Sequence, residues 1–421
     1  MNPKMNRRKF LGNTTLLGAS IAAGSVFAAD QPSAPRKVKV ALIGCGGRGT
    51  GALSNFIDAC KILGLEAEVV ATGDAFQINA ENAGKKYGLP SEKCFSGYDN
   101  YQKVIATDCE YVLMATPPAF RPLHFAAAVA AGKHCFIEKP VAVDPCGARS
   151  IIATGEIANT KKLAVVAGTQ RRHMLAYLRN KALIDAGAIG TIKGGVVQWD
   201  GTVPWTKTRN ADDSNASYLT RNWVNFTELS GDHIVEQHIH NLDVAVWFLG
   251  RLPVTAIGYG GRARRKTGNM FDFFSVDYDF GNDVHIHSQC RQMSGTYQRI
   301  GEVFTGTDGT CFAGGKLSGK KVEIPEIKVD SDNGQVQEHV DMIRSVMVGK
   351  PLNDAKSVAE STLVAIMGRI SAYTGEIVRW SDLMSNEQSP FYQLTCKPTA
   401  ADFEIGEVIL PEEVPPTPGK A

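Results

Sequence analysis

The stretch KVKVALIGCGGRG, at residues 37–49, decides how the first part of this chain folds. Its first seven residues form an apolar, β-branched run typical of a buried strand, and apolar residues recur at helical spacing over residues 53–63. Between the two lie glycines in the Gly-x-Gly-x-x-Gly spacing, namely Gly44, Gly46 and Gly49. Glycines at these positions permit a tight turn and a close approach of backbone to pyrophosphate, and the helix start favours phosphate groups. The stretch therefore predicts a dinucleotide-binding turn.

The carboxylate of Asp74 supports this interpretation, because a lone Gly-x-Gly-x-x-Gly can also be a turn without a ligand. A second strand at residues 67–72 leads to Asp74, which we expect to bind the adenosine ribose hydroxyls. It lies thirty positions after Gly44, beyond the usual ~20, and a longer first helix and loop explains the excess. A carboxylate there repels a 2′-phosphate, so NAD is favoured over NADP. Arg48 can pair with Asp74 or with a phosphate, which weakens that preference.

The rest of the N-terminal part alternates strands with helices. Further strands are predicted at residues 111–116, 134–138 and 163–169, and an alanine-rich helix ends at residue 131. Such alternation is typical of a parallel, doubly wound sheet.

From about residue 160 the strands become longer, and apolar residues alternate with polar ones, as in an antiparallel sheet with one solvated or partner-covered face. These strands are predicted at residues 193–199, 254–259, 273–280 and 284–289, with returning helices near 336–349 and 356–374. The predicted fold class is α/β, with an N-terminal Rossmann sheet and a C-terminal α+β domain that has a large, mainly antiparallel open sheet. The predicted boundaries are 36–160 for the first domain, 161–395 for the second and 396–421 for an extended C-terminal tail.

The composition is that of a soluble globular protein, and 421 residues suit two domains. The formal net charge is +2, but the first 28 residues hold four basic and no acidic residues, so the remainder carries about −2. A near-neutral body gives no electrostatic reason to expect nucleic acid or an anionic membrane surface as partner. The basic run RARRK, at residues 262–266, is interpreted as a solvated turn. Nine cysteines without a Cys-x-x-Cys pair argue against a zinc ribbon or a thioredoxin-like site.

Residues 1–28 are predicted to be an export signal. The sequence NRRKFL, at residues 6–11, precedes an apolar stretch at 16–27, and VFA at 26–28 suits cleavage before Ala29. The paired arginines favour the twin-arginine route, with an ordinary secretory signal or an uncleaved anchor as alternatives. No other segment approaches the ~18 to 20 continuous apolar residues of a membrane span. We therefore expect a periplasmic or otherwise exported protein, handled by the twin-arginine machinery, not stably inserted in the membrane, and retaining its cofactor.

Two further stretches carry a specific resemblance. The first consists of ATPP at residues 115–118, His124, and EKP at residues 138–140. The second is GDHIVEQHIHNLD at residues 231–243, followed by Trp247 and Gly250. Over roughly residues 37–395 the chain resembles the Gfo/Idh/MocA oxidoreductase family. It departs from the family pattern at Glu236, where the family usually has Asp, and at His238, where it usually has glycine. The substrate geometry therefore need not match that of the sugar and inositol dehydrogenases of the family.

The resemblance implies central catalytic roles for Lys139 and His240. An imidazole can exchange a proton near neutral pH because it titrates there when unperturbed, and an ammonium can polarise the same substrate oxygen. Glu236 lies four residues before His240, so on a helix the two side chains share a face. The carboxylate can then orient the imidazole or hold a substrate hydroxyl.

The predicted site has three parts. The predicted catalytic residues are Lys139, His240 and Glu236. The predicted cofactor-binding residues are Gly44, Gly46, Gly47, Arg48, Gly49, Asp74, Thr116, Pro117, His124, Glu138 and Lys139. The predicted substrate-binding residues are Arg172, Tyr177, Glu236 and His240. The structural alternatives are a strand cap at Lys139, a hydrogen-bonding role for His240 and a solvated helix start around Arg172. A zinc site among His233, Glu236, His238 and His240 is disfavoured, because helical geometry scatters these side chains over several faces.

These observations lead to three function hypotheses. The first is an NAD-dependent oxidoreductase of sugars, cyclitols or glycosides with a retained cofactor. The second is a redox-neutral, NAD-dependent glycosidase that oxidises a ring hydroxyl transiently and returns the hydride. The third is a binding protein with a vestigial cofactor, which the presence of both Lys139 and His240 disfavours. The family resemblance also implies a homodimer or homotetramer.

Overall fold

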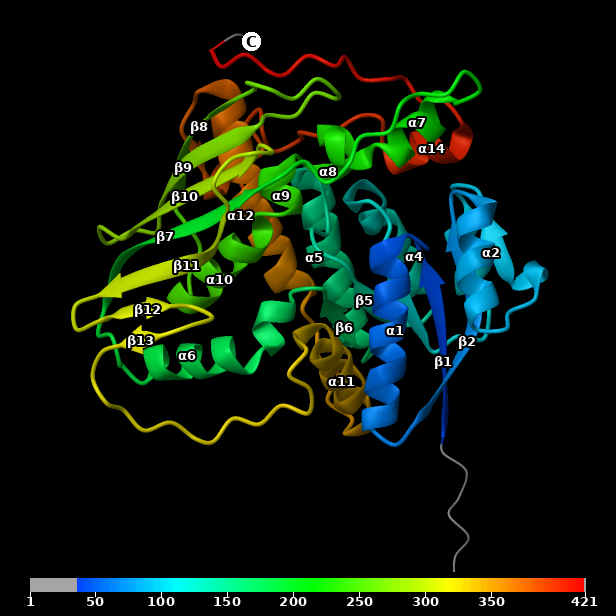
Figure 1. The fold of residues 1–421 in the computed structure, drawn as a ribbon, viewed down its shortest axis with the longest axis horizontal. Helices are drawn as coiled ribbons and strands as arrows, with labels where there is room; N and C mark the ends of the chain where they lie inside the picture. The colour runs from blue at the N-terminus through cyan, green and yellow to red at the C-terminus, as the bar shows by residue number, and fades with distance from the viewer. Residues whose placement is uncertain (1–35, 420–421) are drawn as a thin grey trace, which may run out of the picture. The chain divides into compact units, whose positions relative to one another are not determined.

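The computed structural model describes residues 36–419, so the predicted export signal at residues 1–28 lies outside the described residues. Sheet A has six parallel strands in the order β3-β2-β1-β4-β5-β6 (Figure 1). They are β1 (Lys37–Ile43), β2 (Glu66–Asp74), β3 (Cys94–Ser96), β4 (Tyr111–Met114), β5 (His134–Ile137) and β6 (Val165–Ala167). The strand order reverses direction between β1 and β4, where ligands bind at the carboxyl ends of the strands in such sheets. Sheet A also includes β6, which follows the predicted domain boundary at residue 160.

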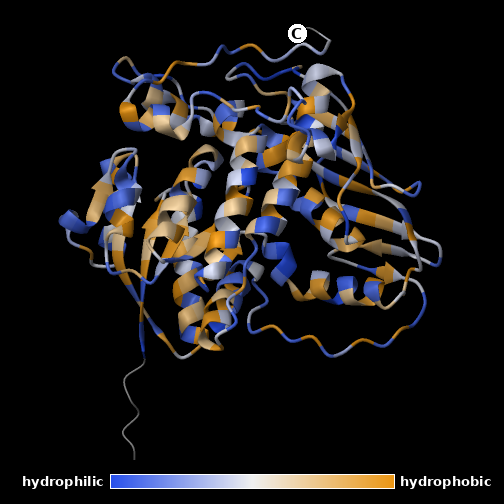
Figure 2. Ribbon diagram, turned by 180° about the vertical axis from the view of Figure 1, so that it is seen from behind, coloured by the Kyte–Doolittle hydropathy of each residue, from blue (hydrophilic) through white to orange (hydrophobic). Residues whose placement is uncertain are grey.

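Helices cover both faces of sheet A, which confirms the doubly wound arrangement. One face packs on α1 (Gly47–Ile62), α2 (Gln77–Lys86) and α11 (Gly334–Met347). The other packs on α3 (Asn100–Ile105), α4 (Arg121–Ala130), α5 (Pro145–Thr160) and α12 (Ala355–Thr374). Two late helices, α11 and α12, therefore return to the first domain as predicted. Figure 2 shows the hydrophobic residues concentrated in these central helices and strands.

Sheet B belongs to the second domain and is mainly antiparallel, with only β7 and β10 paired in parallel. Its strands are β7 (Ile192–Gly201), β8 (Thr255–Gly261), β9 (Phe273–Asp279), β10 (His285–Gln292), β11 (Arg299–Gly306), β12 (Thr310–Phe312), β13 (Leu317–Ser318) and β14 (Val378–Arg379). Every second residue of β10 is buried. The buried face packs on α6 (Leu175–Asp185), α9 (His233–Glu236), α10 (Ile239–Leu249) and α12, so the predicted alternation is confirmed.

The C-terminal tail departs from the prediction of an extended segment over 396–421, because it contains helix α14 (Ala400–Ile405). Thr399 and Asp402 cap this helix reciprocally, and Phe403 is buried against Tyr98 and Phe120 of the first domain. A short helix is stabilised here by its cap and by burial of one aromatic ring, neither of which a periodic pattern reveals. The remaining elements are α7 (Asn215–Arg221), α8 (Thr227–Ser230), α13 (Trp380–Met384), and the 3₁₀ turns Ser91–Lys93, Pro118–Phe120, Gln170–His173 and Trp223–Asn225.

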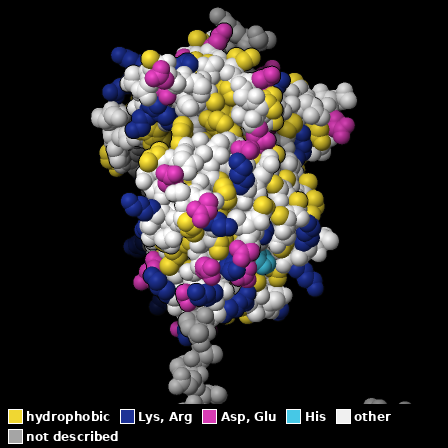
Figure 3. Space-filling model, turned by 90° about the vertical axis from the view of Figure 1, so that its right-hand side faces the viewer, with side chains coloured by type: hydrophobic (Ala, Val, Ile, Leu, Met, Phe, Trp, Pro, Cys, Tyr) yellow, Lys and Arg dark blue, Asp and Glu magenta, His cyan; other side chains and the backbone are white. Residues whose placement is uncertain are grey.

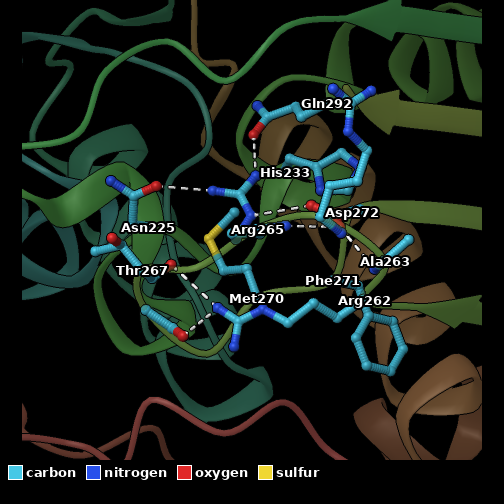
Figure 4. Close-up of polar contacts among 12 residues, drawn as sticks. Asn225, His233, Arg262, Ala263, Arg265, Thr267, Met270, Phe271, Asp272 and Gln292 are labelled. Carbon is cyan, nitrogen blue, oxygen red and sulfur yellow. Dashed lines mark hydrogen bonds and ion pairs between the residues drawn. The ribbon is translucent and has the colours of Figure 1, made fainter. Parts of the chain in front are cut away.

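The basic run at residues 262–266 is a second departure. Arg265 is buried, not solvated, and its guanidinium donates to Asn225 and Gln292 (Figure 4). The interpretation as a solvated turn is therefore wrong for Arg265, although its neighbours Arg264 and Lys266 are exposed. Fixed side-chain acceptors compensate the cost of burying the charge.

On the face drawn in Figure 3, acidic and basic side chains are interspersed. Within residues 36–419, every helix falls short of the length or the apolar character that crossing a membrane would require.

Candidate active site

The glycine turn has the geometry that a bound dinucleotide needs. Gly44 has φ +91°, and a Cβ there would lie 2.6 Å from the amide nitrogen of Thr116. A Cβ on Gly49 would lie 1.8 Å from the backbone oxygen of Gly44, so only glycine lets α1 pack on β1. Around Gly46 and Gly47, by contrast, a Cβ would meet nothing within 4 Å, and no side chain caps the start of α1. The open space at an uncapped helix start fits phosphate groups.

A cavity of about 150 Å³ lies beside this turn. Six predicted cofactor residues line it, namely Gly44, Gly46, Asp74, Thr116, Pro117 and His124. The sequence did not predict its other wall, which includes Tyr98, Phe120, Thr220 and Trp223. Thr220 and Trp223 belong to the second domain and reach this wall only through tertiary packing, so no local motif marks them. The cavity therefore lies between the carboxyl edge of sheet A and a cover from the second domain.

Asp74 lies at the end of β2 and faces this cavity. Its Oδ2 accepts a hydrogen bond from the amide of Cys45 at 2.8 Å, and its Oδ1 accepts from the amide of Phe76 and from Asn79, both at 3.0 Å. These bonds hold the carboxylate in place and tie β2 to the glycine turn. Because each carboxylate oxygen has two lone pairs, Oδ2 keeps one for a further donor such as a ribose hydroxyl.

Arg48 does not pair with Asp74, contrary to one expectation from the sequence. Its Nε donates to Oε1 of Glu138 at 2.6 Å, and the carboxylate of Glu138 is only 6% exposed. The other oxygen of Glu138 accepts from the backbone amide of Lys139 at 3.2 Å. The pairing follows from burial, because a carboxylate in the interior requires a cation or several donors. The ion pair connects the start of α1 to the residue that precedes Lys139.

His124 lines the cavity as a neutral side chain. Its ring stacks on Tyr101 at 4.4 Å between centroids, and its Nδ1 lies 3.4 Å from the hydroxyl of Thr116. Burial, helped by the charge of Arg121, lowers the pKa of His124 to about 3. Its Nε2 is buried without a partner within the part of the chain that the structure describes. An unpartnered buried nitrogen at the cavity wall fits a polar group of a bound ligand.

Lys139 and Glu236 form a clamp between the two domains. The ammonium of Lys139 donates to the backbone carbonyl of Glu236 at 2.8 Å and to its Oε1 at 3.1 Å. The two side chains are 14% and 15% exposed. The end of β5 and the end of α9 therefore meet at one charged contact, and the carboxylate of Glu236 contacts the lysine.

His240 lies in the same region and its charge state differs from the prediction. The ring stacks on Trp199 at 5.7 Å between centroids. Burial lowers the pKa of His240 well below its usual value, and the positive charges of Lys139, Arg171 and Arg48 lower it further. The expectation of an unperturbed imidazole near neutral pH is therefore wrong. The ring is neutral at neutral pH and can accept a proton.

The expected single helical face for Glu236 and His240 is also wrong. α9 ends at Glu236, and α10 begins only at Ile239. At the break the amide of His238 donates to the carbonyl of His233 at 3.1 Å, five residues back, and its Nε2 lies 2.7 Å from the hydroxyl of Ser288. The contact with β10 fixes His238 where a regular helix would continue. Glu236 consequently faces Lys139 instead of orienting the imidazole.

The two secondary substrate candidates are engaged with other protein groups. Arg172 makes a two-point ion pair with Asp243, at 2.9 Å and 2.8 Å. The hydroxyl of Tyr177 donates to Glu302 at 3.2 Å, and the ring belongs to the hydrophobic core of the second domain. The structure therefore does not leave the Tyr177 hydroxyl free for a substrate. α6 packs this side chain inward against sheet B, which the sequence around residues 170–177 does not reveal.

Trp199 adds an aromatic face beside His240. It packs on His240 from β7, and the guanidinium of Arg171 lies 5.8 Å from its ring centroid. Within residues 36–419 no cluster of His, Cys, Asp and Glu has the arrangement of a metal site.

Family profiles match both parts of the chain. The profile described as "Oxidoreductase family, NAD-binding Rossmann fold" matches residues 38–168, and the profile described as "GFO/IDH/MocA C-terminal domain" matches residues 177–312. Inositol 2-dehydrogenase of Burkholderia lata is 29% identical over 253 residues, which are 59% of this chain and 66% of that protein.

Solved structures share the fold at low identity. Myo-inositol 2-dehydrogenase from Lactobacillus plantarum matches with a TM-score of 0.63 and 20% identity, over 82% of this chain and 99% of that one. Levoglucosan dehydrogenase in complex with NADH and levoglucosan matches with a TM-score of 0.64 and 16% identity, over 82% and 99%. Together with the two profile matches, the fold and the site identify this chain as a member of the Gfo/Idh/MocA oxidoreductase family.

Proposed function

We propose that this chain is an NAD-dependent oxidoreductase that transfers a hydride between nicotinamide and a secondary hydroxyl or ketone of a sugar or cyclitol. The observation that carries the proposal is the clamp of Lys139 and Glu236 beside the neutral ring of His240. The ion pair of Arg48 with Glu138, the residue before Lys139, links the clamp to the start of α1. At that helix start the glycine turn has open space for a pyrophosphate. The named relatives, inositol 2-dehydrogenase and levoglucosan dehydrogenase, support the substrate class.

The protein groups divide the work of oxidation. NAD, when bound, would supply the acceptor for the hydride of the carbinol carbon. His240 takes the proton of the substrate hydroxyl, since its ring is neutral at neutral pH. The ammonium of Lys139 donates a hydrogen bond to the same oxygen and stabilises the negative charge that develops on it. Glu236 holds that ammonium in place.

The dinucleotide is NAD in this proposal, and NADP is less favoured. No Lys or Arg side chain lines the cavity beside the glycine turn, within the range that the structure describes. A 2′-phosphate next to the carboxylate of Asp74 would therefore meet a negative charge without a nearby cation. Gly46, Gly47 and the start of α1 would hold the phosphates, and Asp74 the ribose.

The proposal includes export and assembly. The twin-arginine-like sequence at residues 6–11 supports a periplasmic or otherwise exported protein, in which the cofactor stays bound. The uncovered face of sheet B supports a homodimer or homotetramer. Its exposed large side chains include Val196, Ile257, Tyr259 and Phe273. Light scattering on purified protein would measure the assembly, and fractionation of producing cells would measure the location.

One experiment tests the function. The purified protein is denatured to measure released dinucleotide, and the native protein is supplied with a panel of cyclitols, aldoses and anhydrosugars, with NAD and without it. Oxidation of a cyclitol or sugar with formation of reduced nicotinamide is the expected result. Chromogenic glycosides are included as a control. Release of the chromophore without any second redox substrate would instead indicate the redox-neutral glycosidase, and a protein that binds no NAD would contradict both.

A further inference from the structure

Asp232 has a backbone conformation that is normally restricted to glycine. Its φ is 72° and its ψ is 163°, and its side chain is fully buried. A residue with a side chain is strained in this region and persists there only where the surroundings hold it. The residue directly precedes α9, the four-residue helix that ends at Glu236. The strain is therefore located at the start of the element that delivers Glu236 to Lys139.

The surroundings hold the carboxylate of Asp232 with four hydrogen bonds. Its Oδ1 accepts from the backbone amide of His233 at 2.5 Å and from the ring Nδ1 of His233 at 2.9 Å. Its Oδ2 accepts from the amide of Phe271 at 3.0 Å and from the hydroxyl of Tyr373. Burial alone would raise the pKa of Asp232, but these donors outweigh burial and lower it. The carboxylate is thus a fixed anion at the first turn of α9.

The backbone of Asp232 reaches Glu236 directly. The carbonyl of Asp232 accepts the amide of Glu236 at 2.8 Å, which closes the single turn of α9. At the far end of that turn the carbonyl and the carboxylate of Glu236 both accept from Lys139. A helix of one turn has little stability of its own, so the position of Glu236 depends on how its first residue is held.

A second set of hydrogen bonds holds Gln237, the residue that follows Glu236. The buried guanidinium of Arg265 donates to Gln292 at 2.5 Å (Figure 4). The side-chain amide of Gln292 in turn donates to Gln237 at 2.9 Å. Arg265 also donates to Asn225 at 2.7 Å and lies 3.6 Å from Asp272. The chain of bonds therefore ends on the residue that follows Glu236.

We propose that Asp232 and Arg265 are positioning residues for Glu236. Asp232 fixes α9 on one side of Glu236, and Arg265 fixes Gln237 on the other. Together they hold the backbone carbonyl and the carboxylate of Glu236 against the ammonium of Lys139. The kinetic part of the inference rests on the proposed function. Neither residue contacts the cavity beside the glycine turn. Their removal should therefore change how Lys139 is held, and leave NAD binding unchanged.

The test uses the full chain with Arg265→Met and Tyr373→Phe, and Arg264→Met as a matched control. Arg264 belongs to the same basic run, but its side chain is exposed and its guanidinium donates to the carbonyl of Ser294. Its backbone amide donates to Asp272, and the substitution keeps that amide. Acylation of lysines by acetic anhydride is followed by peptide mass spectrometry, with Lys133 as internal reference, because its ammonium is held by two carbonyls far from α9. Arg265→Met and Tyr373→Phe should raise the acylation rate of Lys139 relative to Lys133 by about tenfold, the equivalent of one charge-assisted hydrogen bond.

The kinetic readout separates positioning from mere folding. Both variants should lower kcat by about tenfold with unchanged NAD affinity, and Arg265→Lys, which keeps the charge, should recover part of the loss. Release of Lys139 should also raise the pKa of His240, so the acid limb of kcat/KM should move to higher pH. If Arg265→Met does not fold, Tyr373→Phe decides alone. Wild-type acylation of Lys139 in folded variants would overturn the inference. If the wild-type protein oxidises no sugar or cyclitol, the proposed function fails, while the acylation result still decides the positioning role.

Discussion

Replacing Glu236 with alanine removes one of the two hydrogen bonds that hold the ammonium of Lys139. The bond to the carboxylate, 3.1 Å, is lost, and the bond to the backbone carbonyl, 2.8 Å, remains. A hydrogen bond to a charged group contributes about 1.5–3 kcal/mol, and these side chains are 14% and 15% exposed. Partial exposure to solvent places the value at the lower end, about 1.5 kcal/mol. We expect Glu236→Ala to lower kcat/KM about tenfold.

The double variant tests whether Glu236 acts through Lys139. Lys139→Met alone should lower kcat/KM by about a hundredfold to ten-thousandfold, the range of a positioned proton or charge donor. Because the carboxylate then has no ammonium to hold, Lys139→Met combined with Glu236→Ala should be no slower than Lys139→Met alone. The assay is initial formation of reduced nicotinamide at saturating NAD, with whichever cyclitol or sugar the protein oxidises.

The control is NAD affinity, which should be similar in all four proteins because neither side chain lines the cavity beside the glycine turn. A double variant that is a further tenfold slower than Lys139→Met would refute the reasoning. Additive effects of that size would mean that Glu236 acts on the substrate directly and not through the ammonium.

The remaining predictions concern the cofactor site and the response to acid. Gly49→Ala should prevent stable folding or lower the thermal midpoint strongly, because its Cβ would lie 1.8 Å from a backbone oxygen. Gly47→Ala, whose Cβ would meet nothing within 4 Å, should fold normally but weaken NAD binding, as measured by calorimetry. Asp74→Asn should lower the affinity for NAD by about tenfold and reduce the ratio of NAD affinity to NADP affinity. Equal NAD affinities of variant and wild type would place the ribose contact elsewhere. Burial lowers the pKa of His124 and His238 from 6.5 to about 3. As pH drops below 6.5, these two histidines bind protons in the unfolded chain but not in the folded protein. The free energy of unfolding should therefore fall by about 1.4 kcal/mol per pH unit for each histidine. Urea midpoints that stay constant from pH 7 to 5 would contradict this.

The sequence predicted those parts of the structure that residues close together in the chain form on their own. The strand, glycine turn and helix of residues 37–63 are formed by neighbours, and alternation of strands and helices implies a parallel sheet wherever it occurs. Asp74 and Lys139 follow the ends of two parallel strands, and the carboxyl ends of such strands meet at one edge. Their place at the cavity and the clamp was therefore predictable before any packing was known.

Long-range packing decided the rest. Arg48 pairs with Glu138, ninety residues away, because that carboxylate is buried and requires a cation. A contact with sheet B interrupts the expected helix between Glu236 and His240, and the neighbouring charges of Lys139 and Arg171 contribute to keeping the imidazole neutral. Spacing in a sequence reports which way side chains point along one element, whereas burial and ion pairing depend on which other elements come to lie against it. The sequence by itself thus determined the folds of the two domains and most candidate residues, and only the tertiary structure decided their partners and charges.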